Sequence, residues 1–161
     1  MSGNRPPLIC IVGPSGSGKT TLIVGLVSRL SKRGYSVGTI KHHSHDDFEI
    51  DHEGKDTWQH AKAGAESVSI SSPTMFALIK RVPAELTLDE ISDHMKDRDV
   101  IIAEGFTRSN KPRIVMFMKE SDIAHFGRGR EIVATIDAQP DQEQIERIVD
   151  IVEVFIKKSG Q

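Results

Sequence analysis

Short apolar runs alternate along this chain with stretches in which apolar residues recur at helical spacing. The first run, Leu8–Val12, ends at a glycine-rich turn and is typical of a buried strand. Leu22, Leu26 and Leu30 fall on one face of the helix predicted to follow from Lys19. Further strands are predicted at Val37–Lys41, Ser67–Ser71, Met75–Arg81, Val100–Ala103, Ile114–Met118 and Ile132–Thr135, and short helices at Asp56–Ala63 and Leu88–Met95.

The last part of the chain carries the clearest helical signal. Asp141 and Gln144 stand at the spacing of a helix capping box, directly after Pro140. The apolar positions that follow form one stripe, made of Ile145, Ile148, Val149, Val152, Phe155 and Ile156. Strands that alternate with helices in this order predict an α/β fold with a mostly parallel sheet, in which 67–71 or 75–81 forms an antiparallel edge strand.

The turn after the first strand reads Gly13-Pro14-Ser15-Gly16-Ser17-Gly18-Lys19-Thr20, which fits the P-loop pattern. The glycines let successive N–H groups point inward as a nest for phosphate oxygens, and the helix that follows adds its positive end. Lys19 can reach the β- and γ-phosphates, and the Thr20 hydroxyl can ligate Mg²⁺. An ordinary Gly/Ser turn is the alternative, but the flanking strand and helix favour a triphosphate site in a P-loop NTPase-like three-layer sandwich.

A carboxylate follows the buried run Val100–Ala103. Glu104 stands where ligands bind in open α/β sheets, and Gly105 relieves crowding beside the phosphates. We predict that Glu104 holds the metal or positions water. The alternative is a carboxylate that caps a turn or meets Arg108.

A stretch dense in histidine and carboxylate begins at Lys41, which could place a second positive charge near the phosphates. Five of the seven histidines lie between His42 and His60, interleaved with carboxylates that include Asp46, Asp47 and Asp56. Three readings stay open: a transition-metal site, a loop that faces nucleotide or substrate, and a solvated surface loop. Phe48 and Trp58 flank this stretch, and packing is favoured over base stacking for both rings.

Composition narrows the function classes. The 161 residues predict a single domain, 1–161, and 21 basic against 23 acidic residues give a net charge of −2, which disfavours binding to nucleic acid or a membrane surface. The one cysteine, Cys10, excludes an internal disulfide and a four-cysteine zinc site. No export signal or spanning segment is evident, so we expect a cytoplasmic protein.

The P-loop, Lys41-His42, Gly54-Lys55-Asp56-Thr57, Lys62-Ala63-Gly64-Ala65 and Glu104-Gly105-Phe106 together resemble the MobB family of molybdopterin-guanine dinucleotide biosynthesis. The resemblance implies a homodimeric GTP-binding protein that partners a MobA-type guanylyltransferase, the enzyme that joins GMP to molybdopterin. It also implies that Gly16, Gly18, Lys19, Thr20 and Thr21 hold phosphate and Mg²⁺, with Glu104 near the metal. Lys41, His42 and Asp56 would face the nucleotide or pterin, with Lys19, Glu104 and Asp56 as the candidate catalytic residues.

The residues that would recognise guanine are less evident. Asn110-Lys111-Pro112 begins like a guanine-reading motif, but Arg113 replaces the carboxylate and cannot accept a hydrogen bond. Asp137, after the last strand, could take that role. The leading hypothesis is a GTP-binding adapter with weak GTPase activity. A P-loop small-molecule kinase, with Arg128 and Arg130 on a lid, and a metal-insertion GTPase are the alternatives.

Overall fold

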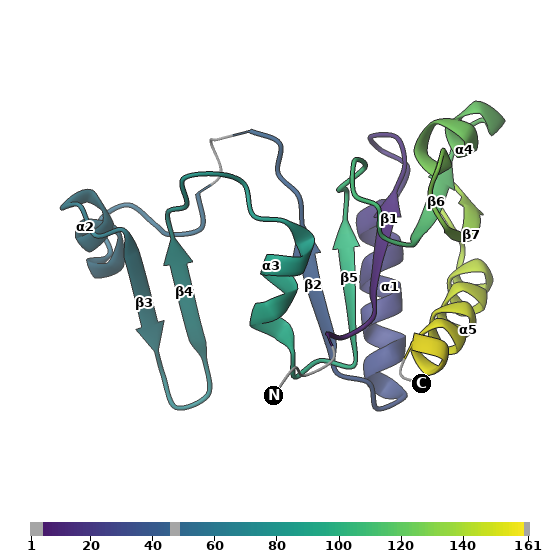
Figure 1. The fold of residues 1–161 in the computed structure, drawn as a ribbon. Helices are drawn as coiled ribbons and strands as arrows, with labels where there is room; N and C mark the ends of the chain where they lie inside the picture. Colours follow the sequence, from purple (N-terminus) through teal and green to yellow (C-terminus); the bar gives the residue numbers. More distant parts are fainter. Residues whose placement is uncertain (1–4, 46–48, 160–161) are drawn as a thin grey trace. The chain divides into compact units, whose positions relative to one another are not determined.

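The computed structural model describes residues 5–45 and 49–159 (Figure 1). By its internal contacts, the chain divides into two compact units. The first consists of Met1–His42 with Leu88–Gln161, and the second is His43–Thr87. The second unit is therefore an insertion into the first, after the strand that ends at Lys41.

The first unit is built on a five-stranded sheet in the order β2-β5-β1-β6-β7. All four neighbouring pairs are parallel, so the carboxyl ends of all five strands lie at one edge. The strands are β1 (Leu8–Val12), β2 (Val37–Lys41), β5 (Val100–Glu104), β6 (Arg113–Phe117) and β7 (Ile132–Asp137). The prediction of an α/β fold with a parallel sheet is confirmed.

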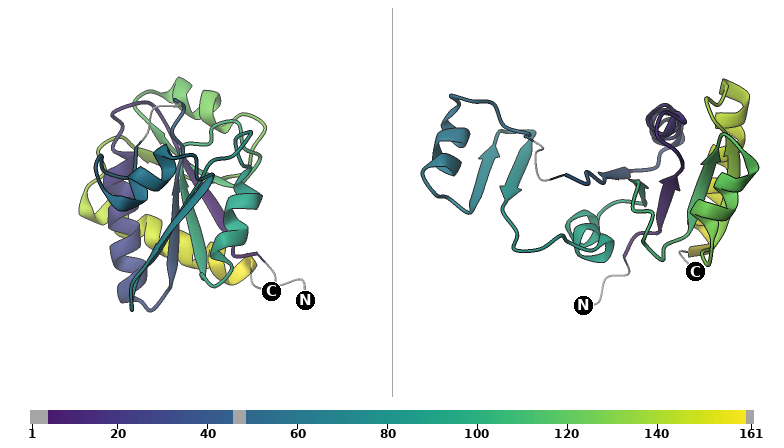
Figure 2. Two further views of the ribbon diagram at one scale, coloured as in Figure 1. Left: turned by 90° about the vertical axis from the view of Figure 1, so that its left-hand side faces the viewer. Right: turned by 90° about the horizontal axis from the view of Figure 1, so that it is seen from above.

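Helices cover both faces of this sheet. Successive residues of β1 point to opposite faces, and those on each face pack against different helices. Ile9 and Ile11 pack with α1 (Lys19–Lys32) and α5 (Gln142–Ser159). Cys10 and Val12 belong to the core of the other face, which includes α3 (Leu88–Ser92) and the following 3₁₀ turn η1 (Asp93–Met95). Figure 2 shows α1 and α3 on opposite sides of the sheet, as the predicted three-layer sandwich requires.

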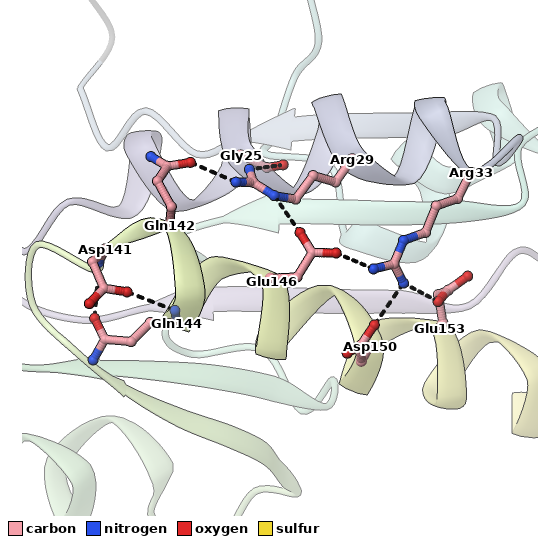
Figure 3. A network of polar contacts seen from close by, with 9 residues as sticks. All are labelled: Gly25, Arg29, Arg33, Asp141, Gln142, Gln144, Glu146, Asp150 and Glu153. Carbon is pink, nitrogen blue, oxygen red and sulfur yellow. Dashed lines mark hydrogen bonds and ion pairs between the residues drawn. The ribbon is translucent and has the colours of Figure 1, made fainter.

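Helices α1 and α5 pack closely and are joined by a network of charged side chains (Figure 3). A Cβ on Gly25 would lie 2.8 Å from the Ile145 side chain, so the two helices approach closely there. Arg29 pairs with Glu146 at 2.7 Å, and Arg33 pairs with Glu146, Asp150 and Glu153. The predicted capping box of α5 is confirmed, because the Gln144 amide donates to Asp141 at 2.8 Å and the Asp141 amide donates to Gln144 at 2.9 Å.

The second unit contains α2 (Asp56–Lys62) and a two-stranded antiparallel sheet of β3 (Ser67–Ser71) and β4 (Phe76–Lys80). The antiparallel pairing is therefore present, with Ser71 opposite Phe76. The prediction of an antiparallel edge strand in the main sheet is wrong in its location, because β3 and β4 pair only with each other. None of the helices in the described part of the chain is both long and apolar enough for a membrane span.

One helix escaped the sequence analysis. Helix α4 (Glu120–Gly127) lies between β6 and β7, a region in which the sequence analysis singled out only Arg128 and Arg130. Asp122, in the first turn, stabilises the start of this helix. Its carboxylate accepts hydrogen bonds from the main-chain N–H groups of Lys119 at 3.2 Å and Met118 at 2.9 Å. A carboxylate in a first turn is a weak signal in a chain with this many acidic residues.

Candidate functional site

The P-loop turns between β1 and α1 at the carboxyl edge of the main sheet, and its glycines adopt backbone conformations that other residues avoid. Gly13, Gly16 and Gly18 have φ angles of 155°, 74° and 90°. A Cβ on Gly13 would lie 2.5 Å from the carbonyl oxygen of Met116 in β6. Within the described residues, the amides of Gly16 and Gly18 enter no hydrogen bond, which leaves them available to an anion.

Lys19 extends over this loop from the first residue of α1. Its ammonium donates to the carbonyl oxygens of Gly13 at 3.1 Å and Pro14 at 2.7 Å. Partial burial lowers the pKa of Lys19, an effect that Glu104 opposes and Lys41 reinforces. Ser15 is exposed beside these residues, whereas Ser17 is fully buried and its hydroxyl has no hydrogen-bond partner among the described residues.

Glu104 faces the start of α1 from the end of β5. Both of its carboxylate oxygens lie 3.5 Å from the Thr20 hydroxyl, and Oε1 lies 3.8 Å from the Lys41 ammonium. Sheet register explains this meeting, because Glu104 stands beside Ile11 of β1 and beside Lys41 of β2. A hydroxyl and a carboxylate are hard oxygen ligands, so this pair fits Mg²⁺. Thr21 is exposed next to Thr20.

The segments that follow β2 and β5 pack against each other. The His42 amide donates to the Glu104 carbonyl oxygen at 3.0 Å, and the His42 ring lies 4.8 Å from that of Phe106. Gly105 has a φ of 85°, and a Cβ there would approach the His42 side chain to 3.1 Å. Lys41, His42, Glu104 and Gly105 are thus brought together beside the P-loop.

The remaining candidates of the histidine-rich stretch belong to the second unit. Asp56 is the first residue of α2 and is exposed. It belongs to the second unit, whereas the P-loop residues belong to the first. The rings of His43 and His45 lie 5.7 Å apart, edge to face. No group of three or more His, Cys, Asp or Glu side chains in the described part of the chain is placed to hold a metal ion. Asp46, Asp47 and Phe48 lie outside the described residues.

The segment after β7 also contacts the P-loop. Asp137 is the last residue of β7, and its side chain is exposed at the carboxyl edge of the sheet. Two residues later, Gln139 donates to the carbonyl oxygen of Gly16 through its side chain at 2.7 Å and to that of Ser17 through its main chain at 3.0 Å. Sequence reasoning missed Gln139, because nothing in the local pattern distinguishes it from any polar loop residue.

Sequence reasoning also missed the role of Arg113, which is buried in β6 and 1% exposed. Its guanidinium donates to the carbonyl oxygens of Thr107, Ser109 and Phe126, and so holds the loop that follows Glu104 and Gly105. Burial lowers the pKa of Arg113. The side chain that disqualified the guanine-reading motif is thus a structural support of the site.

Arg130, a candidate lid residue, donates to the carbonyl oxygen of Ser109 at 2.7 Å, and Arg128 is exposed. The Arg130 contacts join the Gly127–Arg130 stretch to the same loop that Arg113 supports.

Trp58 of the second unit lies under the Lys62 ammonium, which is 5.1 Å from the ring centre.

Comparisons with known proteins agree with one another. The sequence model of the MobB family, described as molybdopterin guanine dinucleotide synthesis protein B, matches residues 8–138. A molybdopterin-guanine dinucleotide biosynthesis adapter protein of Haemophilus influenzae is 37% identical over 120 residues, which cover 73% of this chain and 66% of the relative. The Escherichia coli protein of the same name is 37% identical over 115 residues, which cover 69% of this chain and 65% of the relative. This chain thus spans slightly less than two thirds of these two relatives.

Solved structures give the same result. A crystal structure of molybdopterin-guanine biosynthesis protein B matches with a TM-score of 0.77 at 32% sequence identity, covering 93% of this chain and 99% of that one. A MobB homologue from Bacillus stearothermophilus matches with a TM-score of 0.72 at 21% identity and covers 94% of this chain and 98% of that one, which supports the fold.

Proposed function

Because this chain belongs to the MobB family, we propose that it is an adapter of molybdopterin guanine dinucleotide synthesis that binds GTP with Mg²⁺ and hydrolyses it weakly. The observation that carries this proposal is the P-loop geometry. The left-handed Gly16 and Gly18, the overlying Lys19 ammonium, and the Thr20 hydroxyl facing Glu104 converge at one edge of the sheet.

Each part of this site has a chemical task. The loop amides and the Lys19 ammonium bind phosphate oxygens. Lys41, on the strand that flanks β5 on the side away from β1, adds a second positive charge beside Glu104. Thr20 and Glu104 would hold Mg²⁺, which neutralises phosphate charge when bound. Glu104 can also orient a water molecule. Slow hydrolysis suits a protein whose bound nucleotide serves recognition more than turnover.

Guanine selectivity is assigned to Asp137. Its exposed carboxylate ends β7 at the edge that carries the P-loop. A carboxylate accepts hydrogen bonds from the two N–H groups on the guanine edge, whereas adenine offers an acceptor at one of those positions. Asp137 would therefore favour GTP over ATP, in place of the carboxylate missing at Arg113.

The proposed partners are a MobA-type guanylyltransferase, molybdopterin and a second copy of the chain. An exposed apolar face of the β3–β4 hairpin supports the homodimer, because Phe76 is 68% and Leu78 is 51% exposed on the same face. An isolated two-stranded sheet is marginally stable, so a second copy that covers this face would stabilise it. Sedimentation velocity tests this: a dimer is expected, and Phe76→Glu should convert it to a monomer.

Calorimetric titration of the purified chain with GTP and ATP in the presence of Mg²⁺ tests the nucleotide assignment. We expect tighter binding of GTP, and loss of binding in Lys19→Ala. Lys111→Ala is the matched control. The Lys111 side chain is also partly buried, but its ammonium pairs with Asp89 at 2.5 Å, away from the P-loop. Equal affinity for ATP, or binding that survives Lys19→Ala, would contradict the proposal.

A further inference from the structure

The segment between β7 and α5 is fastened to the P-loop at successive residues. The Gln139 side chain donates to the Gly16 carbonyl oxygen at 2.7 Å, and its amide donates to the Ser17 carbonyl oxygen at 3.0 Å. A Cβ on Gly18 would lie 3.4 Å from the Gln139 nitrogen and 3.5 Å from its side-chain oxygen. Gln139 therefore hydrogen-bonds to two consecutive P-loop residues and lies close to a third.

The backbone of Gln139 is held in an unfavourable conformation by these contacts. Its φ is 56°, a left-handed value that non-glycine residues seldom adopt. Such a conformation persists where the surrounding structure imposes it. Here the surrounding structure is the P-loop on one side, together with Pro140, which is buried and lies two residues before α5.

Both ends of the segment are fixed as well. The Ala138 amide donates to the Phe117 carbonyl oxygen at 2.8 Å, which anchors the end of β7 to β6. Asp141 and Gln144 form the capping box that begins α5. Asp137, the last residue of β7, therefore stands directly before a short segment that is anchored at both ends, and Gln139 joins this segment to the phosphate-binding loop.

We infer that Gln139 is a positioning residue for base selection, which fixes the distance between the phosphate nest and the carboxylate of Asp137. This inference rests on the proposed function. A nucleotide that fits must place its triphosphate in the nest and its base edge at Asp137 together. Loss of the Gln139 side-chain bond should therefore weaken base recognition while the phosphate nest, which keeps its glycines and Lys19, still binds phosphate.

The test uses Gln139→Met, which keeps the side-chain length and removes the donor. Affinities for GTP, ATP and inorganic tripolyphosphate are measured with Mg²⁺, alongside the melting temperature. We expect a threefold to tenfold loss, roughly the contribution of one neutral hydrogen bond, in GTP affinity. Affinities for ATP and tripolyphosphate should change less than about twofold, since neither depends on Asp137.

Two further variants make the result decisive. Gln139→Gly removes the side chain and relieves the left-handed backbone, so it replaces Gln139→Met should that variant fold poorly. Gln142→Met is the matched control, because the Gln142 side chain accepts from Arg29 at 2.6 Å and does not contact the P-loop. A purely structural role for Gln139 would lower the melting temperature without changing the preference for GTP over ATP.

The outcomes are distinct. Unchanged preference for GTP in Gln139→Met and Gln139→Gly would overturn the inference and leave the proposed function standing. Equal losses for GTP and tripolyphosphate would also overturn it, because Gln139 would then only shape the phosphate nest. A wild-type chain that binds none of the three ligands would overturn the proposed function itself.

Discussion

Gly13→Ala is the substitution whose effect on the P-loop can be worked out most directly. The new Cβ would lie 2.5 Å from the Met116 carbonyl oxygen and 3.0 Å from the Met116 Cβ. The carbonyl is main chain, and β1 and β6 are hydrogen-bonded neighbours with Val12 beside Val115. Relief therefore requires one strand to move relative to the other. Overpacking of this kind costs about 1–3 kcal/mol, and the φ of 155° adds roughly 1–3 kcal/mol for any residue other than glycine.

We expect Gly13→Ala to lower the free energy of unfolding by about 2–6 kcal/mol, which is on the order of 10 °C in melting temperature for a protein of this size. Gly34→Ala is the matched control, because Gly34 has a φ of 92° but a Cβ there would contact nothing within 4 Å. Its cost should be only about 1–2 kcal/mol. Thermal unfolding followed by circular dichroism measures both. An equal loss in the two variants would refute the steric reasoning.

Three further predictions follow from charged groups. Between the lowered pKa of Lys19 in the folded chain and the ordinary 10.5, the unfolded chain binds more protons than the folded one, so the free energy of unfolding should rise with pH in that window. The affinity for tripolyphosphate should fall in the same window, because the amine becomes neutral. Lys19→Arg should abolish this fall in affinity, which titrations between pH 7.5 and 10 check. Arg113→Met removes the donor of the Thr107 and Phe126 carbonyl oxygens, while the Ser109 carbonyl oxygen keeps Arg130. It should cost about 2–3 kcal/mol in urea unfolding, against about 0.5 kcal/mol for the exposed Arg108→Met. Three carboxylates raise the pKa of Arg33, with Asp150 contributing most. Arg33→Met should therefore lower the melting temperature at low salt and lower it less in 1 M NaCl; a loss independent of salt would contradict an electrostatic role.

Local patterns predicted those parts of the fold that depend on neighbours in the sequence. The apolar run Leu8–Val12 became the central strand, because a strand buried on both faces needs apolar residues at every position. The glycine spacing located the P-loop, since its φ angles exclude most other residues. The Asp141–Gln144 spacing located the start of α5, because a capping box is completed within four residues.

Features that depend on distant residues were not predictable. Strands β3 and β4 have ordinary strand patterns, and nothing in either pattern states whether they join the main sheet or pair alone. Gln139 acquires its role only because β7 ends beside the P-loop, far away in the sequence. Arg113 reads as a surface residue by type, yet carbonyl oxygens from two other segments make its burial favourable.

The insertion of residues 43–87 between β2 and α3 leaves the two ends of that stretch anchored to the first unit. The entropy of closing such a loop grows only with the logarithm of its length, by about 0.6 kcal/mol for each doubling. Lengthening the segments that link the insertion to β2 and α3 would therefore change the stability of the first unit very little. A change in the length of these linking segments thus has almost no thermodynamic consequence for the main sheet, so insertions there should be tolerated.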